Sequence, residues 1–551
     1  MYTSCAPGGI RTPNNGSEDR YDIHFTTRAN CEHTYTTPKL GKSPKLFYNL
    51  HMKLSANLDQ YAFSIPREVA ITAQILIGAG YEAYLIGGCT RDLILGRKPK
   101  DWDITTNATP EQIISLFPKT FYENTFGTVG VVDENTQDET LKIIEVTPYR
   151  TETTYSDYRR PDSVSFSTKL SHDIERRDFT VNAIAMGIKD GKITEIIDFY
   201  KGQDDIKDKV LRTVGKPEDR FKEDALRMVR AVRLAAELGF TINTEAEKAI
   251  LEHSELLKHI AIERIRDEFN KILMSNSPRE GIIRCQKLGI LRYIIPELEQ
   301  GIGIEQRGTH EYDVYNHLLY SLEGAAGKGW PLDIRLAALL HDISKPETRR
   351  VSHETGTYTF YGHEVVGSRV TQKILERMHY PKKTIEKIVK LVRWHMFFTD
   401  TESITLSAVR RMIVNVGREN IWDLMNLRIC DRIGTGRPKE DPYRLRKYKA
   451  MIEEALRDPV TVGMLKIDGT TLIRELNIPA GPTIGLILNA LLEEVIEDPQ
   501  LNTKEFLMKR SQEMLNMKPE QLKELADRGR TKKEEVEKQE INKIRSKYHV
   551  S

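Results

Sequence analysis

The chain has 551 residues, of which 39% are hydrophobic and 29% charged, a composition typical of a globular protein. Its 82 basic and 80 acidic residues nearly cancel, which excludes a uniformly basic surface and leaves only local patches for binding nucleic acid. No apolar run approaches the roughly 18 residues that span a bilayer, so we expect no membrane segment. The length predicts about three or four domains.

Residues 1–55 are polar, show no apolar period and contain no signal-peptide core, so we expect a disordered extension in which Met52 is an alternative start. The cysteines are scattered without a CxxC pair, which favours the reducing cytoplasm and argues against a zinc ribbon or a disulfide framework. They are Cys5, Cys31, Cys89, Cys285 and Cys430.

Ordered structure is expected from about residue 66. Apolar spacing predicts a helix within 67–83 and another near 110–117, and strand-like runs cover 127–133 and 141–147. These elements predict a small α/β head domain over 56–190.

Two carboxylates within 84–106 give the clearest chemical signal. Asp101 and Asp103 lie two residues apart in a strand-like run, so their side chains should share one face. Paired carboxylates bind Mg²⁺, which neutralises and positions a triphosphate. Glu145, in a later predicted strand, is either a third acidic ligand or an exposed strand carboxylate.

A glycine pair precedes these carboxylates. An apolar strand ends in Gly87 and Gly88 and leads into a short helix that carries Arg91. Glycine lets backbone N–H groups approach phosphate at a helix N-terminus, and arginine adds a cationic clamp. A D-x-D pair alone is common, but its place about ten to fifteen residues after GGxxRD favours nucleotidyl transfer.

The run 221–240 predicts an amphipathic helix with arginines on one face. Asp224 and Arg227 place an acceptor beside a donor, which matches the Watson–Crick edges of cytosine and adenine and not those of uracil and guanine. We therefore expect them to select CTP and ATP. Arg230 and Arg233 continue the face toward triphosphate or RNA, with a solvated basic face as the alternative.

The chain from about residue 190 onward is expected to be helical, and its region 305–435 is rich in histidine. His341 and Asp342 are adjacent at the end of an apolar helix. A lone histidine is more often a core residue, but this pair together with three more histidines and a later aspartate favours a metal whose bound water attacks phosphorus. The further residues are His317, His363, His395 and Asp431.

The motifs GGxxRD, DxD, RRD and EDxxR resemble, in order, those of the bacterial class II tRNA nucleotidyltransferase and poly(A) polymerase family, over about residues 65–300. The resemblance implies a head with a five-stranded sheet, then helical neck, body and tail. It implies untemplated addition of CCA to tRNA from CTP and ATP with Mg²⁺. It also implies that Arg177 and Asp178 contact the ribose, and that 149–166 is the flexible loop that accompanies the switch from C to A addition.

Residues 310–435 resemble the HD-domain metal-dependent phosphohydrolases, with Ser344 where that family usually has glycine. The resemblance implies a divalent transition metal or Mg²⁺, and a 2′,3′-cyclic or terminal phosphate at a damaged tRNA end as substrate. The implied core ligands are His317, His341, Asp342 and Asp431, and the candidates for a second metal are His363 and His395.

The fold class expected is α+β, a small mixed-sheet head followed by an all-α neck, body and tail with an all-helical HD domain. The helical parts are divided into a nucleotide- and RNA-binding neck over 191–304, the HD domain over 305–435, a body over 436–520 and a charged tail over 521–551. Three alternatives remain open: a poly(A) polymerase or A-adding enzyme with the same motifs, a non-catalytic RNA-end-binding protein, and a chain whose principal activity is the HD hydrolase.

Overall fold

The protein is described here by a computed structural model, which covers residues 65–122, 127–152, 164–306, 311–353, 356–397, 405–436, 440–457 and 462–550. The extension expected over 1–55 and most of the predicted loop 149–166 lie outside the described residues. The chain divides into two compact units, the first ending at Lys216 and the second beginning at Pro217.

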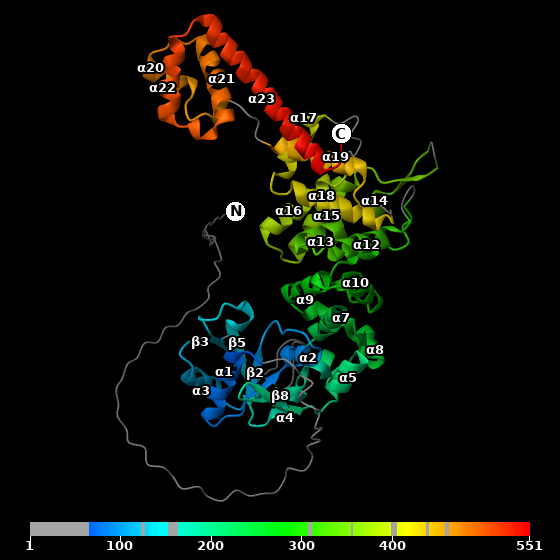
Figure 1. The fold of residues 1–551 in the computed structure, drawn as a ribbon. Helices are drawn as coiled ribbons and strands as arrows, with labels where there is room; N and C mark the ends of the chain where they lie inside the picture. Colours follow the sequence, from blue (N-terminus) through cyan, green and yellow to red (C-terminus); the bar gives the residue numbers. More distant parts are fainter. Residues whose placement is uncertain are drawn as a thin grey trace, which may run out of the picture. The chain divides into compact units, whose positions relative to one another are not determined.

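Unit 1 is built on a seven-stranded mixed sheet with the strand order β3-β4-β5-β2-β1-β8-β9. Figure 1 labels β2, β3, β5 and β8 of this sheet. Its strands are β1 (Tyr84–Ile86), β2 (Asp103–Thr106), β3 (Thr120–Tyr122), β4 (Val129–Val132), β5 (Ile143–Pro148), β8 (Ala185–Lys189) and β9 (Lys192–Ile197). Three strands lie outside this sheet, β6 (Arg150–Glu152), β7 (Val164–Phe166) and β10 (Val210–Leu211). The helices are α1 (Arg67–Gly78), α2 (Gly88–Ile94), α3 (Pro110–Leu116), α4 (Leu170–Glu175) and α5 (Gly202–Asp208).

The middle of this sheet carries the glycine pair and the carboxylates. β1 pairs antiparallel with β2 and with β8, and β2 pairs parallel with β5. In that parallel pair Asp103 lies opposite Glu145. Leu85 and Ile104 are fully buried in the core that fixes these central strands.

The sheet differs from the expectation in two respects. It has seven strands where the family resemblance implied five, because hairpins extend both edges (β3 with β4, β8 with β9). The chain is also not yet helical after residue 190. Asp190 and Gly191 have φ of 50° and 71°, which suits a tight hairpin turn, so β9 follows directly.

Unit 2 is helical except for two-residue strands. Its helices are α6 (Pro217–Glu223), α7 (Leu226–Leu238), α8 (Thr244–His253), α9 (Ile262–Met274), α10 (Pro278–Lys287), α11 (Pro296–Glu299), α12 (Val314–Gly327), α13 (Leu332–Leu340), α14 (Lys345–Thr348), α15 (His363–Arg377), α16 (Lys382–Trp394), α17 (Leu406–Val416), α18 (Ile421–Gly434), α19 (Tyr443–Leu456), α20 (Gly469–Leu476), α21 (Pro482–Glu497), α22 (Lys504–Leu515) and α23 (Pro519–Lys547). The short strands are β11 (Thr241–Ile242), β12 (Arg350–Val351) and β13 (Tyr358–Thr359).

The α+β fold class is confirmed, with a mixed-sheet unit followed by a helical one. The single helix expected over 221–240 is wrong, since the chain breaks between α6 and α7. At the break the Asp224 carboxylate, one residue before the N-cap Ala225, accepts the backbone N–H of Leu226 at 3.1 Å. Among the described residues, no helix is both long and apolar enough to cross a membrane.

Candidate functional site

The turn after β1 brings together a carboxylate and a guanidinium. Gly87 has φ of 89°, a conformation that favours glycine. A Cβ built on Gly87 would lie 2.9 Å from Asp103 Oδ2 and 3.3 Å from Arg177 Nη1. Both charged groups therefore lie directly against bare backbone, where a side chain would displace them.

The second glycine of the pair lies beside the other predicted carboxylate. A Cβ on Gly88 would lie 3.6 Å from Asp101 Oδ1 and 3.7 Å from Arg91 Nη2. Arg91 is 9% exposed, and its guanidinium is held by Asp92 Oδ1 and Asn182 Oδ1, each at 2.8 Å. The glycine pair thus gathers the acidic and basic groups that the motifs predicted.

Two further observations bear on the carboxylates. β2 begins at Asp103, so Asp101 lies in the bend before the strand and not within it. Burial, and then the charges of Asp103 and Asp101, raise the pKa of Cys89 to about 12, as expected if both carboxylates lie close to this thiol. Glu145 is placed next to Asp103 by the parallel pairing.

The RRD motif is anchored by a carboxylate that the sequence reading missed. Asp173 Oδ2 accepts a hydrogen bond from Arg177 Nη2 at 3.1 Å, and Asp178 Oδ1 accepts the N–H of Phe179 at 2.8 Å. Asp173 lies four residues before Arg177, a helical spacing that favours an ion pair. This spacing alone could have predicted the ion pair between Asp173 and Arg177 from the sequence.

In unit 2, both base-selecting candidates have ionic partners. Asp224 Oδ2 accepts from Arg264 Nη2 at 2.9 Å, and Arg227 Nη1 donates to Glu223 Oε2 at 2.6 Å. Arg264 lies forty residues from Asp224 in sequence, so spacing could not have identified it. The two pairs hold the acceptor and the donor in fixed orientations.

The other two predicted arginines, Arg230 and Arg233, are less exposed to solvent than the arginines of a solvated helix face would be. Arg233 Nε donates to Glu268 Oε2, and its Nη1 donates to Glu237 Oε2, both at 2.9 Å. Arg230 is partly buried. Their contact with triphosphate or RNA stays a prediction.

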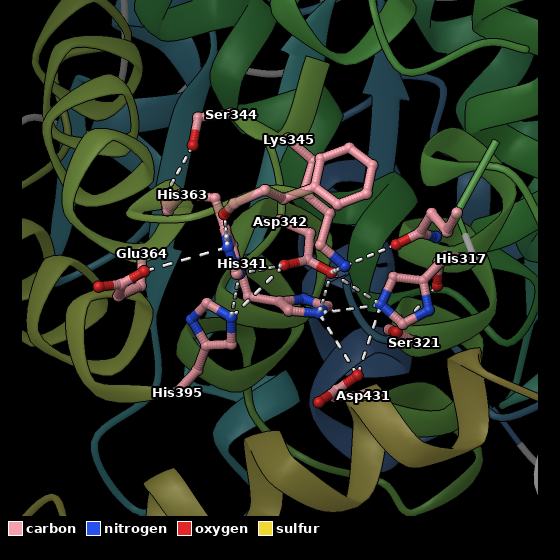
Figure 2. A network of polar contacts seen from close by, with 12 residues as sticks. His317, Ser321, His341, Asp342, Ser344, Lys345, His363, Glu364, His395 and Asp431 are labelled. Carbon is pink, nitrogen blue, oxygen red and sulfur yellow. Dashed lines mark hydrogen bonds and ion pairs between the residues drawn. The ribbon is translucent and has the colours of Figure 1, made fainter. Parts of the chain in front are cut away.

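The histidine region of unit 2 brings all six predicted ligands together (Figure 2). They come from α12, the turn after α13, the first residue of α15, the end of α16 and α18. Among the described residues, two groups of three ligands have all their ligand atoms within 4.8 Å of one another. The first group is His317, His341 and Asp431, and the second is Asp342, His363 and His395.

In the first group, His317 Nε2 lies 3.1 Å from His341 Nε2 and 3.5 Å from Asp431 Oδ1. His341 Nδ1 lies 2.9 Å from the carbonyl oxygen of Ala338. Because a carbonyl only accepts, Nδ1 of His341 carries a proton, and Nε2 is the ring nitrogen that faces the group.

The second group shows the same arrangement more completely. Asp342 Oδ1 lies 3.1 Å from His363 Nε2 and 3.4 Å from His395 Nε2, and these two nitrogens are 3.3 Å apart. Each Nδ1 donates to a backbone carbonyl, of Phe360 and Val392, at 2.7 and 2.6 Å. Asp342 Oδ1 receives no hydrogen bond from a described residue. Acceptors that face one another without a donor favour a bound cation.

The electrostatics favour an ionised Asp342 and a neutral His395. Burial raises the pKa of Asp342, but the charges of Lys345 and His341 outweigh it and hold that pKa well below 3.8. Burial lowers the pKa of His395. Burial lowers the pKa of His341, but the charge and hydrogen bond of Asp342 and the charge of Asp431 together outweigh burial and raise that pKa. An ionised aspartate and a neutral His395 are the forms that bind metal.

Two small residues allow this packing. A Cβ on Gly434 would lie 2.1 Å from Ser321 Oγ and 2.6 Å from the carbonyl oxygen of His317, so α18 approaches α12 only with glycine there. Ser344, at the position where the HD family usually has glycine, donates its hydroxyl to the carbonyl of His363 at 2.7 Å. This serine is thus accommodated and ties the His-Asp turn to α15.

A pocket of about 580 Å³ adjoins the ligand groups. Lys345 Nζ, at its wall, contacts Asp342 Oδ2 at 2.6 Å and Gln306 Oε1 at 2.5 Å. Tyr361, which also lines the pocket, is 88% exposed. The basic and aromatic lining residues, none of them predicted, are Lys345, Arg428, Arg432, Tyr358, Phe360 and Tyr361.

Three family models match the chain in order. The poly A polymerase head domain matches residues 83–212. The probable RNA- and SrmB-binding site of polymerase A matches 239–302, and the HD domain matches 314–435.

The chain is similar to bacterial CCA-adding enzymes. That of Geobacillus thermodenitrificans is 32% identical over 444 residues, which cover 78% of this chain and 94% of that protein. That of Bacillus subtilis is 47% identical over 210 residues, 38% of this chain and 50% of that protein. A crystal structure of the Bacillus stearothermophilus CCA-adding enzyme in complex with CTP has a TM-score of 0.53 and 29% identity, covering 81% of this chain and 97% of that one. The family predicted from the motifs is confirmed, and the chain is a nucleotidyltransferase that belongs to the CCA-adding enzyme family.

Proposed function

We propose that this chain adds CCA to the 3′ end of tRNA from CTP and ATP, with the chemistry in unit 1. The observation that carries the proposal is the convergence of Asp101 and Asp103 on the Gly87-Gly88 turn, with Arg177 beside it. Membership of the CCA-adding enzyme family supports the choice of substrate.

Phosphoryl transfer requires groups that bind metal ions and groups that bind phosphate, and we assign these two roles to different residues of unit 1. Asp101 and Asp103, with Glu145 beside them, would hold two Mg²⁺ ions. Bound Mg²⁺ supplies charge neutralisation of the triphosphate and activates the attacking 3′-hydroxyl. The bare backbone of the glycine pair admits phosphate oxygens, and the anchored Arg91 clamps them.

Nucleotide selection is assigned to the remaining motifs. Arg177 and Asp178 would contact the ribose. In unit 2, Asp224 accepts from the amino group of cytosine or adenine and Arg227 donates to the neighbouring ring nitrogen, the reverse of what uracil and guanine offer.

The test is incorporation into tRNA that lacks its CCA end, with Mg²⁺ and labelled CTP or ATP supplied singly and together. Two C residues and one A, followed by arrest, support the proposal. Long A tracts from ATP alone would instead assign a poly(A) polymerase, and one A on tRNA ending in CC an A-adding enzyme. RNA binding without incorporation would assign a non-catalytic end-binding protein.

Variants sharpen this test. Asp103→Ala should lower the rate by several orders of magnitude, because metal positioning carries the chemistry. Asp190→Asn is the matched control, since Asp190 is an exposed hairpin carboxylate of the same unit whose Oδ1 accepts from Gln74 Nε2 at 3.3 Å. Near-normal rates for Asp103→Ala would remove Asp103 from the catalytic residues.

We also propose that the HD domain is a metal-dependent phosphohydrolase that acts on a 2′,3′-cyclic or terminal phosphate at an RNA end. The support is the set of facing acceptors at Asp342, His363 and His395. The aromatic and basic lining of the adjoining pocket suits a base beside a phosphate. A divalent transition metal or Mg²⁺, when bound, would supply the attacking hydroxide.

Calorimetric titration of the full chain with Ni²⁺ or Mn²⁺, followed by hydrolysis of 2′,3′-cyclic AMP and AMP, tests this second activity. His341→Ala should abolish metal binding at this site and hydrolysis while leaving CCA addition intact. His253→Ala, on α8, is the control. Loss of both activities in His341→Ala would show that the two sites are not independent, and unchanged hydrolysis would refute the assignment.

A further inference from the structure

Behind the RRD motif lies a buried carboxylate for which the proposed mechanism has no use. The Asp173 side chain, on α4, is 0% exposed. Its Oδ1 accepts from Arg176 Nε at 2.9 Å. Its Oδ2 accepts from Arg177 Nη2 and from Thr105 Oγ1, both at 3.1 Å. Burial raises the pKa of Asp173, but the two arginines outweigh burial and lower it, so the group is ionised.

One of those arginines reaches the glycine turn. While Arg177 Nη2 is held by Asp173, its Nη1 lies 3.3 Å from the position of a Cβ on Gly87. The Arg177 side chain is 17% exposed, and its Nε has no hydrogen-bond partner among the described residues. Asp173 therefore holds one nitrogen of the Arg177 guanidinium, while the other terminal nitrogen lies beside the Gly87 turn.

The same carboxylate is tied to the strand that carries Asp103. Thr105 lies two residues after Asp103 in β2, so both side chains point to the same face of the sheet. Through Thr105, Asp173 sets the position of Arg177 relative to that strand. Asp103 Oδ2 lies 2.9 Å from the same Cβ position on Gly87. If the hydrogen bond to Asp173 were lost, the Arg177 guanidinium would be close enough to Asp103 to form an ion pair with it.

We propose that Asp173 is a positioning residue for nucleotide binding, which holds Arg177 for the ribose and triphosphate and keeps it from pairing with Asp103. The proposal rests on the nucleotidyl transfer proposed above. It predicts two effects when the charge of Asp173 is lost: weaker, less ribose-selective nucleotide binding, and weaker metal binding at Asp103.

The experiment uses the full chain with Asp173→Asn, which keeps the shape and removes the charge. The Kd of CTP and of dCTP is measured by calorimetry without tRNA, and Mn²⁺ affinity by electron paramagnetic resonance. We expect the Kd of CTP to rise about tenfold, as for one lost charge-assisted hydrogen bond. The preference for CTP over dCTP should fall by a similar factor, and Mn²⁺ should bind more weakly.

Asp205→Asn is the matched control. Asp205 is 6% exposed, in the same unit, and accepts from Thr180 Oγ1 at 2.7 Å and from Arg212 Nε at 3.3 Å. This variant loses a carboxylate that is also buried and paired with an arginine but holds no residue of the glycine turn. The thermal stability of this variant should fall. Its CTP affinity and its preference for CTP over dCTP should stay within about twofold of the wild type, well below the roughly tenfold change expected for Asp173→Asn.

Thr105→Val provides a milder perturbation, since it removes one hydrogen bond to Asp173 without changing charge. It should weaken CTP binding by a smaller factor, and it decides the matter if Asp173→Asn does not fold. The proposal is overturned if a folded Asp173→Asn binds CTP and dCTP as Asp205→Asn does. It is likewise overturned if Asp173→Asn does not fold and Thr105→Val leaves the CTP and dCTP affinities unchanged. Absence of incorporation by the wild type would refute the proposed function instead, because nucleotide binding is read without tRNA.

Discussion

Replacing Gly87 with alanine tests whether the bare turn is needed by the Asp103 carboxylate. Gly87 has φ of 89°, where a side chain adds about 1–2 kcal/mol of strain. The new Cβ would lie 2.9 Å from Asp103 Oδ2, whereas ordinary contact begins at 3.4 Å. The carboxylate must therefore retreat by about 0.5 Å. A misplacement of about 1 Å costs roughly a hundredfold in rate, so half that shift predicts about a tenfold lower kcat.

Gly80→Ala separates strain from contact. Gly80 also has φ of 89°, but nothing lies within 4 Å of its Cβ position. The two variants should therefore lose similar free energy of unfolding, and only Gly87→Ala should lose catalytic rate. The assay is the initial rate of CMP incorporation into tRNA lacking CCA, measured alongside thermal unfolding.

Equal kcat for the two folded variants would refute the reasoning, since it would mean that Asp103 tolerates the added methyl group. A larger fall for Gly80→Ala would show that backbone strain, and not contact with Asp103, governs the rate.

Three further predictions concern single contacts. Gly434→Ala should lower the free energy of unfolding by about 1–3 kcal/mol and weaken Ni²⁺ binding, because the new Cβ would clash with the carbonyl oxygen of His317. Gly327→Ala is the control, since nothing lies within 4 Å of its Cβ position. Thermal unfolding and Ni²⁺ titration should show neither effect for this control. Asp224→Ala should reduce discrimination against UTP by about ten- to a hundredfold, read as the CTP to UTP ratio of kcat/KM, and an unchanged ratio would remove Asp224 from base selection. The pKa of Asp173 is lowered from its ordinary 3.8, so its contribution to stability is present above that value and lost as pH falls below it. Urea unfolding should therefore show Asp173→Asn clearly less stable than the wild type at pH 7, with the difference shrinking below pH 3.8, and a constant difference would contradict the ion pairing.

Much of the head site was predictable because its signals are local. The glycine pair, the spacing of Asp101 and Asp103 and the order of the motifs all lie in the sequence itself. The exact ends of the elements were not: β2 starts only at Asp103, and the helix expected over 221–240 breaks where the Asp224 carboxylate accepts the N–H of Leu226. Side-chain capping competes with helix continuation, and apolar spacing alone does not show which prevails.

The HD ligands were predictable as residue types, but the position of Asp342, with Oδ2 beside His317 and Oδ1 beside His363, was not. A His-Asp pair at a helix end and scattered histidines indicate a metal. Their division into two groups depends on which oxygen of Asp342 faces which histidine, and that is set by the packing of five elements. Contacts such as Arg264 with Asp224 likewise join segments far apart in the chain.

The sequence by itself predicted the family, through the order of its motifs, as well as the α+β fold class and the candidate residues of both sites, because motif order and residue spacing are local properties of the chain. Only the tertiary structure decided which groups meet: Glu145 beside Asp103, Arg177 between Asp173 and the glycine turn, and the two HD ligand groups. The physical reason is that these contacts depend on strand pairing and helix packing between distant segments, which no local periodicity specifies.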